Sequence, residues 1–370
     1  MSRLSGAIVA AYVTAVGSIA ASPVVRLPAW AIGPFSRPPN VNPLIKPDSN
    51  AEFLCPMRQT SVRWESLHTF NPSAAVHDGK VFLLYRAEDD SGTMEIGMHT
   101  SRLGLSISND GLHFTRESAP VFYPSDDPQK RYEWTGGCED PRLIASDGGG
   151  YVLTYTQWDR KTARLAVATT SDFIHWQKHG PAFAVAYQGR YLNLWSKSGA
   201  IVGQVRDGQL TAVKINGRYW MYWGEGEVHL ATSTDLINWY PVETEPGKLF
   251  AALPRRPGKF DSDLVEGGPP AVLTENGIVA IYNGQNARSN GDPSLNPGAY
   301  AVGQALFDAH DPTKLLARLD EPFFRPEMPY EKTGQYQAGT TFCEGLIWFH
   351  GKWFLYYGCA DSFVGVAVSP

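Results

Sequence analysis

A tight turn followed by an aromatic or apolar run occurs five times in this chain, and this repeat constrains the fold more than any other feature. The copies cover residues 79–85, 149–155, 217–223, 277–282 and 351–357. Their spacing is roughly 60 to 75 residues. A second apolar run precedes each copy, at 73–76, 142–144, 212–215, 270–273 and 345–349. Each pair of runs predicts a β-hairpin.

Three copies continue into a third strand that ends in a corner with an Asp and an aromatic ring, at 108–114, 171–176 and 233–239. The Asp is typical of a residue that caps a tight turn, and the ring packs on the neighbouring strand. One unit cannot bury both faces of its sheet, so the units have to pack on one another, and a closed ring achieves this. The sequence therefore predicts an all-β fold, a five-bladed β-propeller over residues 31–370. The main alternative is a pair of β-sandwiches, whose strands recur about every 8–12 residues without the longer period.

The last repeat ends close to Pro370 without a complete outer strand. We therefore expect residues 39–47 to complete the last blade and close the ring. Propellers often close in this way, because an edge strand left open would expose unpaired backbone groups.

The first 30 residues differ from the rest of the chain. Arg3 precedes an apolar, small-residue run over 4–21, and Ser18-Ile19-Ala20 resembles a signal-peptidase site. Residues 1–30 are either a signal peptide, which implies a secreted or periplasmic protein, or an N-terminal arm of a cytoplasmic one. No other run is long enough to span a membrane, so we expect no membrane partner.

Composition excludes some classes of partner. The formal net charge is -5 and no dense Lys/Arg cluster occurs, which argues against nucleic acid. Aromatic residues make up 12% of the chain, which suits both strands and sugar binding. Cys55, Cys138, Cys343 and Cys359 lack metal-ligand spacing, so we expect buried thiols and no metal. Oligomeric state is left open.

Polar residues recur in phase with the repeat, at the start of the first strand or the end of the second. They are Asn71, Arg86, Glu139, Asp140, Arg142, Lys197, Glu225, Glu266, Asn283, Glu344 and Asp361. In a propeller these positions surround the axis, so they predict one carboxylate-rich funnel with a few basic side chains. The run GGCEDPRLI is the most distinctive, because a proline fixes the backbone between two acids and an arginine.

The motifs FNPSAAVHDGKVFLLYRAED, GCEDPRLI, VKINGRYWMYWGEGEVHLATSTDLINW, EGGPPAVLTENGIVAIYNG and YYGCADSFVGVA together resemble glycoside hydrolase family 130, the β-mannoside phosphorylases and β-mannosidases. The similarity runs from about residue 34 to residue 368. The resemblance also implies a five-bladed propeller. It implies that Asp140 is the proton donor, acting through a sugar hydroxyl, and that Asn71, Arg86 and Asp361 hold a mannose in the cleaved-side subsite. We group Arg142 with these substrate-binding residues.

The chain departs from the phosphorylase members of that family where they bind phosphate. Glu225 stands where those members have a basic residue, Glu266 lies near the position of a usual Lys, and Asn283 replaces a His. Carboxylates repel a phosphate dianion, so we expect Glu225 and Glu266 to activate water instead. Which of the two is the base is left open, and Glu227 is a further candidate.

The sequence thus predicts an inverting β-mannosidase that acts on a mannose-containing oligosaccharide, with short β-1,2-linked manno-oligosaccharides as the expected substrate and no organic cofactor. One alternative is a phosphorylase that binds phosphate through Lys197 and Arg164. Another is a non-catalytic carbohydrate-binding propeller, and a more remote one is the related arabinanase and fructosidase group. A structural reading of Arg86 and Arg142 is that they neutralise Glu88 and Glu139. Trp134, Trp158 and Trp195 could stack on sugars, but for most of them core packing is favoured.

Overall fold

The computed structural model describes residues 26–370, and in this part of the chain almost all regular structure is β-strand. The helical segments of this part are short: α1 (Lys130–Glu133), η1 (Ala186–Gly189) and η2 (Pro329–Glu331). Within residues 26–370 no helix has the length and apolarity needed to cross a membrane. The predicted signal-like run over 4–21 lies outside the described residues. The expected all-β class is confirmed.

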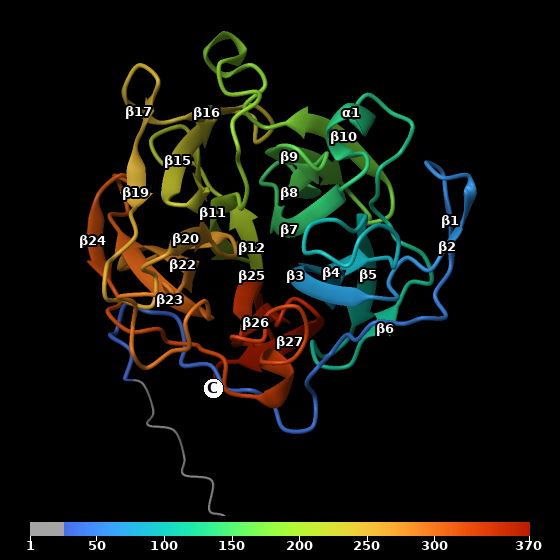
Figure 1. Ribbon diagram of the computed structural model, residues 1–370. Coiled ribbons are helices and arrows are strands. Elements are labelled where there is room, and N and C mark those ends of the chain that lie inside the picture. The colour runs from blue at the N-terminus through green and yellow to red at the C-terminus, as the bar shows by residue number, and fades with distance from the viewer. Residues whose placement is uncertain (1–25) are drawn as a thin grey trace, which may run out of the picture.

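The strands form five antiparallel meanders that follow one another around a common centre (Figure 1). The first contains β3 (His68–His77), β4 (Lys80–Glu88), β5 (Ser101–Ser108) and β6 (Thr115–Arg116), and the second contains β7 (Gly137–Ala145), β8 (Tyr151–Trp158), β9 (Ala163–Thr170) and β10 (Trp176–Pro181). The third contains β11 (Ala200–Arg206), β13 (Tyr219–Trp223), β15 (Val228–Ser233), β16 (Trp239–Pro241) and β19 (Ala251–Leu253). The fourth contains β20 (Leu264–Gly267), β21 (Ala271–Thr274), β22 (Gly277–Gln285), β23 (Tyr300–Phe307) and β24 (Leu315–Arg318), and the fifth contains β25 (Thr341–Phe349), β26 (Lys352–Cys359) and β27 (Phe363–Val368).

Short strands complete the pairing. They are β1 (Phe53–Cys55) with β2 (Thr60–Val62), β12 (Gln209–Ala212) with β11, β14 (Glu225–Gly226) with β20, and β17 (Glu243–Glu245) with β18 (Lys248–Leu249). Parallel contacts join neighbouring meanders near the centre, for example Val202 of β11 with Ala271 of β21. The arrangement is consistent with a propeller. That it has five blades stays an interpretation, which the five meanders support.

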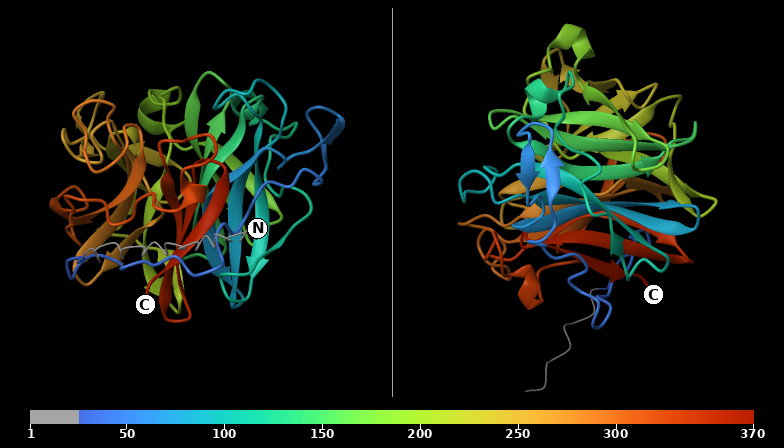
Figure 2. Two further views of the ribbon diagram at one scale, coloured as in Figure 1. Left: turned by 60° about the horizontal axis from the view of Figure 1, so that its bottom comes forward. Right: turned by 90° about the vertical axis from the view of Figure 1, so that its right-hand side faces the viewer.

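The N-terminal segment lies beside the last meander, as expected (Figure 2). Antiparallel bridges join Ser36 to Val368 and Ile45 to Val364. Between them the Asn42 side chain donates to the carbonyl of Val366 and accepts its N–H, both at 2.8 Å. The segment therefore covers the open edge of β27 and joins the two ends of the chain.

The repeat predicted the second strand of every meander correctly, because β4, β8, β13, β22 and β26 coincide with its five copies. The expected first strand of the third unit, 212–215, was wrong. That place is taken by β11, which pairs with both β13 and β12, and β12 ends at Ala212. The run 212–215 is apolar because it packs in the core, where Val213 and Ile215 are buried.

The predicted corners have the expected turn chemistry. Asp110, Asp172 and Asp235 each accept the backbone N–H groups of the residues two and three positions later, at 2.8–2.9 Å. His175 pairs with Asp172 at 2.7 Å, which agrees with its assignment to structure. These Asp side chains fix the turns without reaching the centre of the ring.

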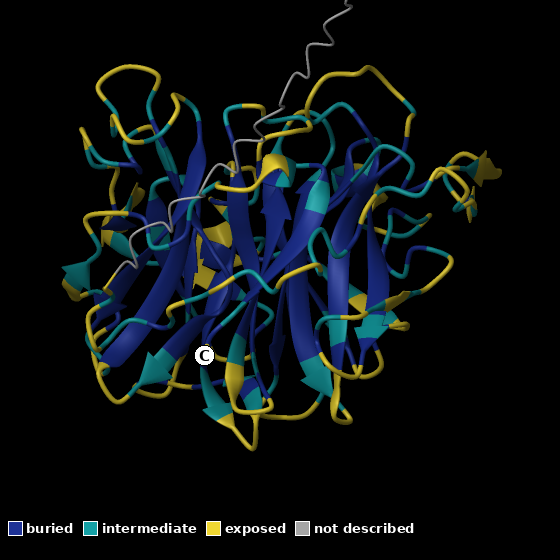
Figure 3. Ribbon diagram, turned by 90° about the horizontal axis from the view of Figure 1, so that it is seen from below, coloured by how far each residue is buried: buried dark blue, intermediate teal, exposed yellow. Residues whose placement is uncertain are grey.

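Burial is concentrated in the strands, while exposed residues lie in the loops and at strand ends (Figure 3). Trp64, Trp223 and Trp239 are among the largest fully buried side chains. All four cysteines are buried and unbridged, as predicted. Burying such rings between sheets contributes roughly 1.5–3 kcal/mol for each large apolar side chain. This core holds the strand ends that carry the site.

Candidate active site

One pocket is lined by side chains from all five meanders. Its polar lining residues are Asn71, Arg86, Glu88, Glu139, Asp140, Lys197, Glu225, Glu266, Tyr300, Gln335, Tyr336 and Asp361. Eight of the eleven in-phase polar positions predicted from the sequence lie in this lining, whereas Arg142, Asn283 and Glu344 do not. The Asn283 side chain instead bonds to the backbone of Cys343, at 2.8 and 3.1 Å. Most of the polar positions that recur with the repeat therefore meet in one place.

Backbone bulges direct several of these side chains. The register of β3 with β4 shifts at Asn71, that of β7 with β8 shifts at Asp140, and that of β25 with β26 shifts at Glu344. Asn71 and Asp140 have left-handed φ values of 46° and 50°, and each precedes a proline. A bulge re-aims a side chain, and proline leaves no N–H unpaired where the ladder is interrupted. The Asn-Pro and Asp-Pro pairs thus turn a polar group toward the pocket.

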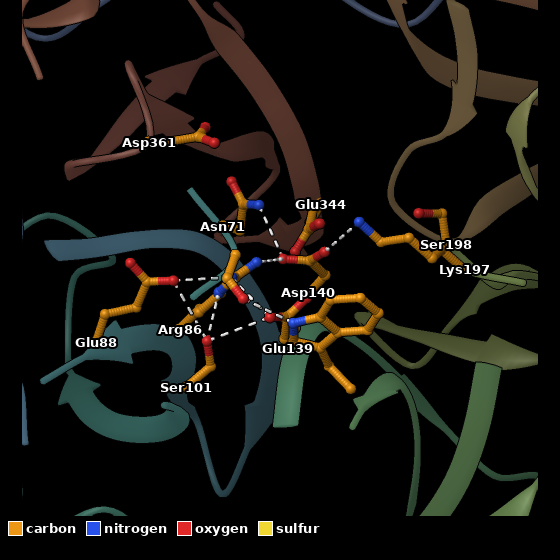
Figure 4. Close-up of polar contacts among 12 residues, drawn as sticks. Asn71, Arg86, Glu88, Ser101, Glu139, Asp140, Lys197, Ser198, Glu344 and Asp361 are labelled. Carbon is orange, nitrogen blue, oxygen red and sulfur yellow. Dashed lines mark hydrogen bonds and ion pairs between the residues drawn. The ribbon is translucent and has the colours of Figure 1, made fainter. Parts of the chain in front are cut away.

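Asp140 is surrounded by donors (Figure 4). Its Oδ1 accepts hydrogen bonds from Asn71 Nδ2 at 2.9 Å and from an Arg86 guanidinium nitrogen at 3.0 Å, and Lys197 Nζ lies 3.2 Å from its Oδ2. Burial raises the pKa of Asp140, but the charges of Lys197 and Arg86 outweigh burial and hold the pKa well below its usual range. Asp140 is therefore ionised at neutral pH in this arrangement.

Arg86 links several carboxyl groups. One guanidinium nitrogen lies 2.8 Å from both Glu88 and Glu139, and its Nε donates to Ser101 Oγ at 3.0 Å. Burial raises the pKa of Glu139 to about 7, against the opposing charge of Arg86. Arg86 thus pairs with Glu88 and Glu139, as one interpretation of the sequence predicted, and it also forms part of the pocket wall.

Glu225 and Glu266 are cross-strand partners on β14 and β20. Trp195 Nε1 donates to Glu225 Oε2 at 2.6 Å, and the Ser198 hydroxyl donates to Glu266 Oε1. The Glu225 side chain is 26% exposed, whereas Glu266 is 2% exposed. Burial, opposed by the charge of Lys197 and reinforced by that of Glu225, raises the pKa of Glu266 to about 7.

Lys197 lies between these carboxyl groups, because its Nζ is 3.9 Å from Glu225 Oε1 as well as 3.2 Å from Asp140. Burial lowers the pKa of Lys197, but Glu225 and Asp140 outweigh burial and raise it well above its usual value. Lys197 is therefore a firmly charged ammonium group in the pocket wall.

Asp361 follows β26 and lines the pocket with a left-handed φ of 49°. Among the described residues its carboxylate has no hydrogen-bond partner, and Figure 4 shows it apart from the Asp140 cluster. Burial raises its pKa to about 7. The carboxyl group is placed to meet a ligand.

Arg142 does not lie in the pocket lining, so its prediction as a substrate contact is not supported. It donates to the carbonyls of Gly267 at 2.7 Å and Gly268 at 2.9 Å, and it lies 3.2 Å from Glu344. Only 1% of Arg142 is exposed. The bulge at Asp140 interrupts the alternation of β7 and turns Arg142 behind the pocket, where it lies beside Glu344 rather than Glu139. Burial raises the pKa of Glu344 well above its usual range, against the opposing charge of Arg142.

Two other candidates also lie outside the lining. Glu227 was expected on the same side as Glu225, but Gly226 between them has a φ of +93°, which breaks the alternation. Arg164, proposed for the phosphorylase alternative, pairs with Asp159 at 2.9 Å and with Asn193 at 3.0 Å. Its two terminal guanidinium nitrogens are thus engaged away from the pocket.

The three candidate tryptophans differ in where they lie relative to the pocket. Trp158 and Trp195 line the pocket, and Trp195 is 48% exposed, so Trp195 is not a core ring. Trp134 lies under the Arg58 guanidinium, 5.6 Å from its ring centre.

Sequence reasoning missed Ser198, Tyr300, Gln335 and Tyr336. Ser198 directly follows Lys197, and its contact with Glu266 leaves no signal in the sequence. Gln335 and Tyr336 lie between β24 and β25, outside the phase of the repeat, so the periodicity could not identify them.

The pocket lining holds six carboxyl groups against two basic side chains, Arg86 and Lys197. Such a wall suits a neutral, hydroxyl-rich ligand, because carboxylates accept hydroxyl hydrogen bonds and repel dianions. Within residues 26–370 no group of three or more His, Cys, Asp or Glu side chains is arranged to hold a metal ion.

Comparison with known proteins places this geometry in context. A family model described as β-1,4-mannooligosaccharide phosphorylase matches residues 42–370. The chain is 30% identical over 315 residues to a 1,2-β-oligomannan phosphorylase of Thermoanaerobacter sp. strain X514, covering 84% of this chain and 93% of that relative.

Two solved structures are more similar. One was reported with the statement that the GH130 family of mannoside phosphorylases contains glycoside hydrolases that target β-1,2 mannosidic linkages in Candida mannan. It is 55% identical, covers 93% of this chain and 96% of its own, and has a TM-score of 0.92. The other is a glycosyl hydrolase from Bacteroides ovatus, 55% identical with the same coverage and a TM-score of 0.91.

Proposed function

This chain belongs to glycoside hydrolase family 130, and on that premise we propose that it is an enzyme that hydrolyses β-1,2-linked mannosides with inversion. The match over residues 42–370 confirms the resemblance found in the sequence. The observation that carries hydrolysis is the placement of Glu225 and Glu266 as adjacent carboxyl groups in the same pocket as Asp140. The solved structure that is 55% identical, reported with hydrolases of β-1,2 mannosidic linkages, supports this choice.

Glu225 is the proposed base. It is the more exposed member of the carboxyl pair, and its Oε1 has no hydrogen-bond partner among the described residues. In the proposed step Glu225 removes a proton from water while the water oxygen bonds to the anomeric carbon from the face opposite the leaving oxygen. Glu266, whose pKa burial raises to about 7, orients that water through its proton.

The leaving oxygen takes its proton from Asp140, through a sugar hydroxyl. Asp140 is ionised beside Lys197, whereas the pKa of the neighbouring Glu139 is raised to about 7. We infer that the two carboxyl groups act as one coupled pair that shares a proton near neutral pH. A sugar hydroxyl that replaces the Lys197 contact moves this proton to Asp140. Asn71, Arg86 and Asp361 then hold the mannose whose bond is cleaved.

Phosphorolysis is the second candidate, and the relatives' named activities favour it over hydrolysis. Two relatives from Thermoanaerobacter sp. strain X514 are named as phosphorylases, of 1,2-β-oligomannan and of β-1,2-mannobiose. Lys197 supplies one cation in the pocket wall, and a protonated Glu266 would lessen the repulsion of phosphate. The Oε1 atom of Glu225 argues against phosphorolysis, because it accepts no hydrogen bond from a described residue and can serve as a base.

One experiment separates these functions. The full chain is incubated with mannobioses of each β linkage, with and without inorganic phosphate, and the first product is followed by NMR. Hydrolysis yields α-mannose without phosphate, and phosphorolysis yields mannose 1-phosphate only with it. Turnover that depends strictly on phosphate would replace our proposal with the second candidate. A chain that binds mannosides without turning them over would be a carbohydrate-binding propeller.

A further inference from the structure

Trp195 makes a direct contact with the proposed base. We propose that Trp195 is a positioning residue: its indole N–H holds one carboxylate oxygen of Glu225 so that the other oxygen is left to take the proton of the attacking water. The inference rests on the proposed function, in which Glu225 is the base. It adds a residue whose side chain cannot itself transfer a proton in the reaction.

The contact engages only one side of the carboxylate. Trp195 Nε1 donates to Glu225 Oε2 at 2.6 Å, a short distance typical of a hydrogen bond to a charged acceptor. Glu225 Oε1 lies 3.9 Å from Lys197 Nζ, which is beyond hydrogen-bond range. Among the described residues Oε1 therefore has no hydrogen-bond donor, and it faces a pocket that both residues line.

The backbone fixes Trp195 opposite Glu225. Ser196 N donates to the carbonyl of Ala163 at 3.0 Å, and Gly224 N donates to the carbonyl of Lys197 at 2.9 Å. These two bonds tie the segment after Trp195 to β9 and to the residue before Glu225. Backbone hydrogen bonds to Ala163 and Gly224 thus hold the segment from which the indole reaches the carboxylate.

A second indole supports the first. The rings of Trp158 and Trp195 meet edge to face with centroids 5.6 Å apart. Trp158 Nε1 donates to the carbonyl of Gly97 at 2.8 Å, so Trp158 is itself anchored. Trp158 therefore helps to hold the ring that donates to Glu225.

The chemistry of indole suits this role. Its N–H donates but has no lone pair to accept, and it does not titrate in the range of a carboxylic acid. The indole therefore holds one oxygen of Glu225 and restricts rotation of the carboxyl group. Glu266 has no such partner, because its contact is a hydroxyl of Ser198, which both donates and accepts.

The test uses the full chain, β-1,2-mannobiose and phosphate-free buffer. Trp195→Phe keeps a flat ring and removes the N–H. We expect kcat to fall about 10-fold or more while KM changes less than about threefold, and the acidic limb of kcat/KM to move up by about half to one pH unit. Trp176→Phe is the matched control, because the Trp176 indole donates to the carbonyl of Phe173 at 3.1 Å outside the pocket lining, and it should leave the acidic limb where it is. Circular dichroism and thermal melting show whether both variants fold.

A double-mutant cycle with Glu225→Ala shows whether Trp195 acts through Glu225. With azide supplied as the nucleophile in place of water, so that no base is needed, Trp195→Phe should have little further effect in the Glu225→Ala background. Equal losses in both backgrounds, or an unchanged acidic limb in Trp195→Phe, would overturn the inference. Failure of the proposed function is a different result, in which wild-type protein gives no product without phosphate.

Discussion

Asn71 and Asp140 occupy equivalent bulges in consecutive inner strands, and the Asn71 amide donates to Asp140 Oδ1 at 2.9 Å. Both residues have a left-handed backbone and both precede a proline. Asn and Asp tolerate this backbone conformation better than most residues do. The same local device in two blades therefore brings a carboxylate and its amide partner together.

Asn71→Ala should impair the site more than the fold. The variant loses a hydrogen bond to an ionised carboxylate, and we expect kcat/KM on β-1,2-mannobiose to fall at least about 10-fold. The left-handed φ of 46° adds a folding cost of about 1 kcal/mol for Ala. Asn290→Ala is the control, because Asn290 is exposed with a φ of 59°. Equal activity of the two variants would exclude a role for the Asn71 amide.

Glu266→Gln should stabilise the protein at high pH. Burial raises the pKa of Glu266 to about 7, so the folded state binds its proton more tightly than the unfolded chain does. The contribution of Glu266 to the free energy of unfolding is therefore largest below the ordinary pKa of Glu, and it decreases as the pH rises through about 7. Gln is always neutral, so the gain in free energy of unfolding should be about 1–3 kcal/mol at pH 8 and near zero at pH 4.

Urea unfolding at both pH values checks this, with the exposed Glu275→Gln as a control. A gain that is the same at pH 4 and pH 8 would mean that Glu266 does not titrate as the structure implies.

The sequence predicted the fold well because its signal is local. Each Gly-containing turn and aromatic run marks β4, β8, β13, β22 or β26, and strands that are buried on both faces require such continuous runs. The first strand of the third meander was missed because β11 contains Gly203 and follows a long irregular segment. An apolar core segment at 212–215 gave a stronger signal than the true strand.

The site was predicted less completely, for geometric reasons. Polar positions in phase with the repeat identified Asn71, Asp140 and Glu266. The alternation of a strand, however, cannot predict where a side chain points when it lies beside a bulge. That is why Arg142 was expected in the pocket and lies behind it. Trp195 lies outside any strand, so only its three-dimensional position reveals its contact with Glu225.

Lys197→Met should destabilise the protein and inactivate the site. The ammonium group lies 3.2 Å from Asp140 and 3.9 Å from Glu225, and its loss leaves buried carboxylates uncompensated. Removing one partner of a buried charge pair typically costs about 3–5 kcal/mol. The pKa of Asp140, now held down by Lys197, should rise.

Thermal unfolding and the pH profile of kcat/KM measure these effects. Lys214→Met is the control, because Lys214 is exposed and lies 4.8 Å from the ring centre of Tyr219. If Lys197→Met retained wild-type stability, the pocket carboxyl groups would have to be largely protonated, contrary to the ionised Asp140 inferred here.

Asn42→Ala tests closure of the ring, separately from the site. The Asn42 side chain makes two hydrogen bonds of 2.8 Å to the backbone of Val366 on β27. Their loss should lower the free energy of unfolding by about 1–3 kcal/mol, since two hydrogen bonds at a partly buried edge are removed. Activity at 25 °C should remain within about twofold of wild type, because Asn42 lies outside the pocket lining. The exposed Asn276→Ala should change neither quantity in urea unfolding and initial-rate measurements. Unchanged stability of Asn42→Ala would show that the N-terminal segment lies against β27 without contributing to closure.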